Sequence, residues 1–245
     1  MTPPAPKGPA PKAPATAASE PVATGTGDGP PQPVTSGSGP LLIGLTGPIG
    51  CGKSTVAQWL SDGGAVVVDA DAVARDATAP GRPGHDAVLA RFGDAFRRED
   101  GTLDRAALGR HVFADPAALV ELERIVHPLV RPRILAAIEA ARTSGTPVLV
   151  IEAIKLVEAG YAAMCDEVWL ITCPPSDQHS RLVARGLTPD DARQRAMAQA
   201  GMAERLAGVA SRVIDTSGSE ALARRRVRRA LAAARARRDA APRGQ

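Results

Sequence analysis

The chain contains no asparagine and few aromatic residues, and each shortage narrows the possible functions. Without asparagine it has no N-glycosylation site, and it lacks the Asn-Lys-x-Asp motif with which GTPase switches typically select guanine. Aromatic residues make up 2% of the 245 residues, as two Trp, one Tyr and three Phe. Side chains on which nucleic-acid bases stack are therefore scarce.

Long apolar runs and regular cysteine spacings are also missing. No run approaches the ~20 residues that a membrane-spanning helix needs, and the N-terminus lacks the charged and apolar regions of a secretory signal. Cys51, Cys165 and Cys173 show neither metal-type nor paired spacing, which suits a reducing compartment. We therefore expect a cytoplasmic protein with no membrane partner.

What is present is enough for a folded core with flexible ends. The chain is 44% hydrophobic and 23% charged, a composition typical of globular domains. Residues 1–39 are almost wholly Pro, Ala, Gly, Ser and Thr, which cannot bury enough apolar surface to offset the entropy of ordering. We expect a disordered leader there and a disordered tail at 241–245.

Arginine is concentrated near the C-terminus, where nine arginines follow residue 223 in a chain of net charge +4. The cluster is consistent with a nucleic-acid-binding surface. The interpretation we favour is the solvated face of a final helix, begun by Ser217 with Glu220 as a capping box. No aromatic residues are interleaved with it, so we expect no nucleic-acid partner, and keep a nucleic-acid-binding ATPase as an alternative.

The segment with the clearest chemistry matches G-x-x-x-x-G-K-[ST], the phosphate-binding loop. A short apolar run at 41–46 precedes it and a helical pattern at 55–60 follows it, as such a loop requires. Lys53 is expected to reach the outer phosphates of a nucleotide and Ser54 to bind Mg²⁺. The expected nucleotide contacts are Gly47, Pro48, Ile49, Gly50, Cys51, Gly52, Lys53, Ser54 and Thr55.

Strand and helix patterns alternate along the chain, and most of the apolar runs are continuous. This predicts an α/β fold of three layers with a five-stranded parallel sheet. The expected strands are 41–46, 65–69, 147–152, 167–172 and 212–215. We expect a core at 40–72 and 146–240, a helical acceptor-binding insertion at 73–145 and a lid at 174–200. Within the insertion, Asp104 and Asp115 are each expected to cap a helix, and a third helix is expected to start after His127-Pro128.

Carboxylates follow two of these strands. Asp69 and Asp71 come at the end of the second strand, where one can orient an acceptor hydroxyl while the other holds water around Mg²⁺. Asp71 is alternatively a helix cap. Glu152 ends the third strand, where an acidic ligand for Mg²⁺-bound water is expected.

Positive charge is expected from the lid. Arg181 and Arg185 lie four residues apart on a predicted helix and are candidates for stabilising the transferred phosphate, or else form a solvated face. His127 is expected to line the acceptor pocket. Cys51, next to a helix N-terminus, is either a small loop residue or a redox brake on nucleotide binding.

Several motifs together resemble the dephospho-CoA kinase family. They are Ile43–Gly47 with Gly52–Thr55, Val68–Asp71, Ala79–Gly81, Phe92-Gly93, Asp100–Arg105, Val112-Phe113, Ile125–Pro128, Gln178 with Arg181 and Arg185, and Val213–Asp215. The similarity runs from about 41 to 218. The Asp-Ala-Asp and Leu-Asp-Arg signatures are more specific than the phosphate-binding loop.

The resemblance implies transfer of the γ-phosphate of ATP, with Mg²⁺, to the ribose 3′-hydroxyl of dephospho-CoA. By the same resemblance, Asp71 lies nearest that hydroxyl, and Leu103, Arg105 and His127 join Asp69 on the acceptor side. A monomer or small homo-oligomer is expected. Another small-molecule kinase, acting on a nucleoside or nucleotide, is the alternative.

The chain departs from the family pattern at three places. Pro48 stands where glycine is usual, and Thr216 replaces an asparagine after the last strand. Residues 151–156, Ile-Glu-Ala-Ile-Lys-Leu, replace a common Pro-Leu-Leu pattern after the third strand, so the resemblance does not define the acceptor contacts there.

Overall fold

The computed structural model describes residues 39–240. The expected disordered leader, apart from its last residue, and the expected tail at 241–245 lie outside the described residues. No helix in the described range is long and apolar enough to cross a membrane.

Five parallel strands form one sheet in the order β2-β3-β1-β4-β5, which confirms the predicted fold class. The strands lie within a residue of the ranges expected from sequence: β1 Leu41–Thr46, β2 Val66–Asp69, β3 Val148–Glu152, β4 Glu167–Thr172 and β5 Arg212–Asp215. β1 and β3 are buried along their whole length. Their apolar runs are continuous because helices cover both faces of the sheet.

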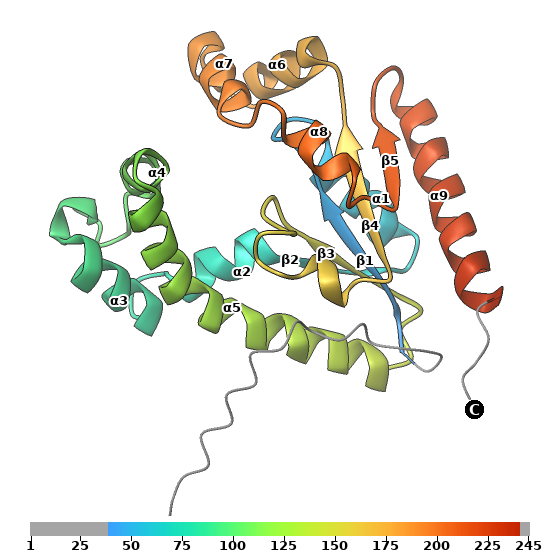
Figure 1. Ribbon diagram of the computed structural model, residues 1–245, viewed down its shortest axis with the longest axis horizontal. Coiled ribbons are helices and arrows are strands. Elements are labelled where there is room, and N and C mark those ends of the chain that lie inside the picture. Colours follow the sequence, from blue (N-terminus) through green and yellow to red (C-terminus); the bar gives the residue numbers. More distant parts are fainter. Residues whose placement is uncertain (1–38, 241–245) are drawn as a thin grey trace, which may run out of the picture. The chain divides into compact units, whose positions relative to one another are not determined.

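Two groups of helices cover the sheet (Figure 1). One face packs on α1 (Lys53–Asp62) and α9 (Glu220–Ala240), and the other on α5 (Pro116–Thr143) and α8 (Met202–Ala207). Alternate residues of each central strand serve the two faces, so that Ile43 packs toward α1 and its neighbour Leu42 toward α5. The result is the expected three-layer arrangement.

Helices fill the region between β2 and β3. They are α2 (Ala70–Ala77), α3 (Pro83–Phe92), α4 (Arg105–Ala114) and α5, with a 3₁₀ turn at Asp94–Phe96. Asp104 caps α4 as expected by accepting hydrogen bonds from the Ala106 and Ala107 amides. A small apolar cluster that includes Val88, Leu108 and Val112 lies among these helices, separate from the sheet clusters. That the region is an acceptor-binding unit stays a prediction.

The expected start of a helix after His127-Pro128 was wrong, because α5 continues through both Pro128 and Pro132 for 28 residues. Each proline removes a backbone hydrogen bond. Both prolines lie on the exposed side of α5, where water can satisfy the freed carbonyls. The opposite side buries Ile134 against the sheet, and this burial holds the helix together.

The C-terminal helix α9 begins two residues later than the sequence indicated. The amide and hydroxyl of Ser217 donate hydrogen bonds to the Asp215 carboxylate. The hydroxyl of Ser219 instead accepts a hydrogen bond from the Leu222 amide and caps the helix. Several arginines in this helix pair with carboxylates of the core: Arg224 with Asp62, Arg226 with Asp215, Arg237 with Glu167 and Arg238 with Asp166. These pairs account for part of the arginine cluster as packing of α9.

The absence of paired cysteines, expected from their spacing, was also wrong. Cys51 of the phosphate-binding loop and Cys173, just after β4, form a disulfide across a separation of 122 residues. Linear spacing could not reveal it, because the fold brings the ends of β1 and β4 together. Cys165 is a free cysteine whose burial raises the pKa of its thiol to about 12, so this thiol stays protonated at neutral pH.

We predict that reduction of the Cys51–Cys173 disulfide destabilises the fold. Crosslinks that close long loops typically add about 2–4 kcal/mol, so a reductant should lower the melting temperature by roughly 5–15 °C. Thermal unfolding with and without reductant measures this. The C173S variant is the matched control: it should melt like the reduced protein and ignore the reductant. An equal shift in C173S would contradict the prediction.

Candidate active site

The phosphate-binding loop takes a backbone path that its glycines make possible. Gly47, Gly50 and Gly52 have φ values of 139°, 79° and 90°, a region that other residues rarely adopt. At Gly47 there is also no space, because a Cβ atom would lie 2.2 Å from the carbonyl oxygen of Ile171. Helix α1 begins directly after Gly52, so the positive end of the helix lies at the loop.

Lys53 is buried at the centre of this loop, with 8% of its surface exposed. Its ammonium donates to the carbonyl oxygens of Gly47 and Pro48 at 2.8 and 3.2 Å. Burial lowers the pKa of Lys53, and the carboxylates of Glu152 and Asp71 oppose that shift. The lysine is therefore held inside the cradle, close to both carboxylates.

Ser54 and Glu152, the two expected metal-binding residues, are in direct contact. The Ser54 hydroxyl donates to a carboxylate oxygen of Glu152 at 2.8 Å. Burial raises the pKa of Glu152, while this hydrogen bond lowers it. Hydroxyl and carboxylate oxygens suit Mg²⁺, which is bound through one or two protein ligands while it keeps several waters. The donor set thus fits the expected ion.

The two carboxylates after β2 have different roles. Asp69, not Asp71, caps α2 by accepting from the Ala72 amide, and it also pairs with Arg75. The helix-capping role considered as an alternative for Asp71 therefore belongs to Asp69. Asp71 lies in the first turn of α2, where burial and the charge of Asp69 raise its pKa, while a backbone hydrogen bond from Ile154 and the charge of Lys53 lower it.

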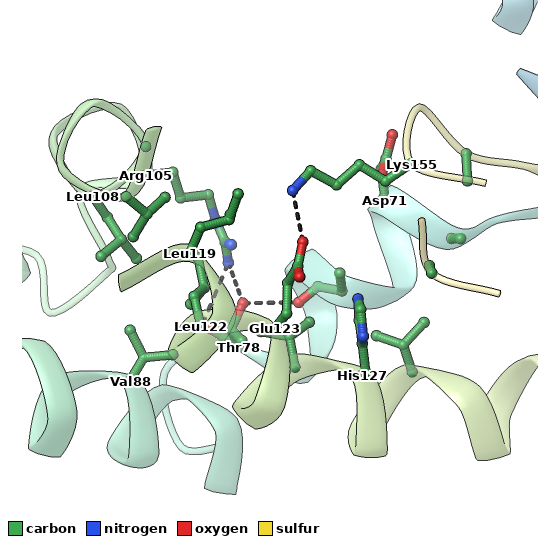
Figure 2. Close-up of a pocket in the computed structure, with 18 of the residues that line it drawn as sticks. Asp71, Thr78, Val88, Arg105, Leu108, Leu119, Leu122, Glu123, His127 and Lys155 are labelled. Carbon is green, nitrogen blue, oxygen red and sulfur yellow. Dashed lines mark hydrogen bonds and ion pairs between the residues drawn. The ribbon is translucent and has the colours of Figure 1, made fainter. Parts of the chain in front are cut away.

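A cavity of ≈ 290 Å³ adjoins Asp71 on the side of the helical insertion (Figure 2). All the residues expected on the acceptor side except Asp69 line it: Asp71, Leu103, Arg105 and His127. Its wall is largely apolar, with Val88, Leu108 and Leu122 among the lining side chains. A partly apolar acceptor fits such a lining.

Arg105 and His127 shape this cavity in different ways. The Arg105 guanidinium donates to the Thr78 hydroxyl and to the Arg75 carbonyl, both at 2.9 Å, and so ties α4 to the end of α2. His127 lies midway along α5. Its place in the lining agrees with the expected role as a pocket residue.

The lid candidates lie on α6 (Pro175–Ala184) and α7 (Pro189–Met197). Arg181 is in the last turn of α6, whereas Arg185 follows its end, so the two do not share the helix as expected. The Arg181 guanidinium donates to the side chain and backbone oxygens of Thr216. The charge of Arg185 lowers the pKa of Lys53, which places Arg185 within electrostatic reach of the loop.

Sequence reasoning missed several contacts that hold the phosphate-binding loop. The Gln199 side chain accepts from the amide of Ile49 at 2.7 Å, and Gln178 donates to the carbonyl of the same residue at 2.8 Å. Thr216, seen from sequence only as a departure, donates through its hydroxyl to the carbonyl of Cys51 at 2.7 Å. No sequence pattern predicts the role of Gln199, because its hydrogen bond with the Ile49 amide joins two segments that are distant in the chain.

Comparisons with known proteins agree on one family. A family model described as dephospho-CoA kinase (CoaE) matches residues 41–221. A dephospho-CoA kinase of Symbiobacterium thermophilum is 45% identical over 179 residues, covering 73% of this chain and 74% of that protein. One of Geobacter sulfurreducens is 43% identical over 187 residues, covering 76% and 94%.

Solved structures agree with the fold. The crystal structure of TT1252 from Thermus thermophilus superposes with a TM-score of 0.66 at 34% identity, covering 81% of this chain and 98% of that one. Dephospho-CoA kinase from Campylobacter jejuni gives a TM-score of 0.56 at 24% identity, covering 78% and 95%.

We predict that G47A destabilises the protein far more than G64A does. Both glycines have positive φ, but a Cβ at Gly64 would meet nothing within 4 Å. G64A should therefore show only the backbone penalty, about 1–2 kcal/mol, whereas G47A adds a clash with the backbone of β4. Denaturant unfolding of both variants measures the difference. Equal losses would show that the close approach at Gly47 does not constrain the loop.

Proposed function

Because the chain belongs to the dephospho-CoA kinase family, we propose that the residues above transfer the γ-phosphate of ATP to the ribose 3′-hydroxyl of dephospho-CoA. The products are coenzyme A and ADP. The observation that carries this proposal is the position of Asp71. Asp71 lines the acceptor cavity. Its charge also raises the pKa of Lys53 in the phosphate-binding loop, and the charge of Lys53 lowers the pKa of Asp71.

Asp71 is the proposed partner of the acceptor hydroxyl. Its carboxylate accepts a hydrogen bond from that hydroxyl and orients the oxygen toward the γ-phosphate, and it is the nearest group to take the proton as the new P–O bond forms. Burial and Asp69 raise the pKa of Asp71, which makes its carboxylate a better proton acceptor than an exposed aspartate.

Positive charge on the phosphates comes from the loop and the lid. We propose that Lys53 leaves the carbonyls it now contacts and binds the outer phosphates, and that the backbone amides of Gly47–Thr55 cradle them. Arg181 and Arg185 then stabilise the charge on the group in transfer. When the lid closes, the Arg181 guanidinium gives up its hydrogen bond to Thr216 and bonds to phosphate oxygens instead.

We propose that Ser54 and Glu152 hold Mg²⁺, Ser54 directly and Glu152 through a bound water. Their contact supports this pairing. When bound, the ion neutralises phosphate charge. The division into core, acceptor insertion and lid, the cytoplasmic location and the oligomeric state stay predictions.

A coupled ADP-release assay tests the function. With ATP and Mg²⁺, dephospho-CoA should support turnover, and adenosine, AMP and CMP should not. Identification of coenzyme A as the product completes the assignment. ADP formed with a nucleoside or nucleotide acceptor, and none with dephospho-CoA, would instead assign another small-molecule kinase activity.

A further prediction concerns the pH dependence of kcat/KM. Since a raised pKa keeps Asp71 protonated to higher pH, the acid limb of kcat/KM should lie above the ordinary aspartate value of about 3.9. The D69N variant retains a capping side chain but removes a negative charge that raises the pKa of both Asp71 and Glu152. Its acid limb should therefore move to lower pH.

We expect the acid limb of D69N to lie below that of the wild-type protein, because a negative charge that raises both pKa values is gone. The D62N variant is the control, because Asp62 pairs with Arg224 and contributes to neither pKa. A D69N profile that coincides with the wild-type profile would rule out this coupling.

A further inference from the structure

Lys155 spans the acceptor cavity as one half of an ion pair (Figure 2). Its ammonium reaches from the segment after β3 to a carboxylate oxygen of Glu123 on α5, at 2.7 Å. The same ammonium lies 5.7 Å from the centre of the Phe113 ring. Both charged side chains line the cavity and remain about one third exposed. A ligand entering the cavity therefore meets this pair.

The Lys155 ammonium is held by fewer hydrogen bonds than the guanidinium of Arg105, which also lines the cavity. The Arg105 guanidinium is held by the carbonyls of Arg75 and Thr78 and by the Thr78 hydroxyl. Releasing it would leave those oxygens unsatisfied. Among residues 39–240, Lys155 has a single hydrogen-bonding partner, the Glu123 carboxylate, and this side chain can rotate into water. Its ammonium can therefore exchange Glu123 for a ligand anion at low cost.

Lys155 is also close in the chain to the reacting end of the cavity. Ile154, the preceding residue, hydrogen-bonds through its backbone to Asp71. In dephospho-CoA the diphosphate is attached to the same ribose that carries the 3′-hydroxyl. An acceptor whose hydroxyl lies at Asp71 thus has its diphosphate one sugar away, a span that a lysine side chain can cover.

We propose that Lys155 determines acceptor specificity by binding the diphosphate of dephospho-CoA, and that Glu123 holds the ammonium across the cavity until this anion replaces it. The proposal rests on the dephospho-CoA kinase activity stated above. Glu123 then competes with the substrate for Lys155. The two halves of the ion pair consequently have opposite effects on acceptor binding, which a purely structural ion pair would not produce.

Steady-state kinetics of K155M, K155R and E123Q test this. K155M should raise the KM for dephospho-CoA about tenfold and leave the KM for ATP and kcat within about twofold of wild type. K155R, which keeps the charge, should restore most of the affinity. E123Q should have a KM for dephospho-CoA no higher than wild type, because the competing carboxylate is gone.

A merely structural ion pair predicts a different pattern. K155M and E123Q would then raise the KM for dephospho-CoA alike, and that result overturns the proposal. An unchanged KM in K155M also overturns it. Thermal unfolding of each variant verifies that the compared proteins are folded.

Fragments of the acceptor provide a readout that does not depend on turnover. Pantetheine is neutral and 4′-phosphopantetheine carries the phosphate nearest the pantetheine arm. The wild-type protein should bind the phosphorylated fragment more tightly, and K155M should lose most of that preference. No preference in the wild-type protein, or an unchanged preference in K155M, would contradict an anion site at Lys155.

The wild-type assay separates this inference from the function itself. If wild type fails to phosphorylate dephospho-CoA, the proposed function fails, whatever the variants do. If wild type is active and the variants follow the structural pattern, only the role of Lys155 fails.

Discussion

The chemistry of the site depends on the parallel pairing of β3 with β1 and β2. In this register Glu152 lies opposite Leu45 of β1 and opposite Asp69 of β2. The carboxyl ends of the three strands therefore meet at one edge, where the phosphate-binding loop leaves β1 and α2 leaves β2. A slip of one residue would turn Glu152 to the other face of the sheet and separate it from Ser54. The backbone ladder thus fixes the position of the proposed metal-binding residue.

Helix α5 connects this edge to the acceptor cavity. Its C-terminal half packs on the sheet through Ile134 and Ile138, and its N-terminal half joins the apolar cluster of the insertion through Ala118. One unbroken helix thus carries both the sheet contacts and the cavity residues Glu123 and His127. The proposed lid is built differently, since its helix α7 buries only Ala192. Few buried apolar side chains favour local opening of α7.

The sequence was sufficient to predict features with a local cause. Strand positions follow from continuous apolar runs, the loop from its glycines and lysine, and the Asp104 and Asp115 caps from side chains that bond to the next turn. Features that depend on tertiary contacts were missed or wrong. The Cys51–Cys173 disulfide and the Gln199 contact join segments more than 100 residues apart, and α5 passes through two prolines because burial of its far side outweighs a local preference.

The two glutamines on Ile49 have a thermodynamic consequence. Gln178 and Gln199 belong to the proposed lid, and between them they engage both the carbonyl and the amide of one loop residue. A nucleotide that rearranges this peptide must change the free energy of the lid as well. By linkage the reverse holds with equal magnitude: anything that shifts the lid changes nucleotide affinity by the same factor. Occupancy of the loop and the position of the lid are therefore a single coupled equilibrium, although the residues involved are about 130–150 positions apart in the chain.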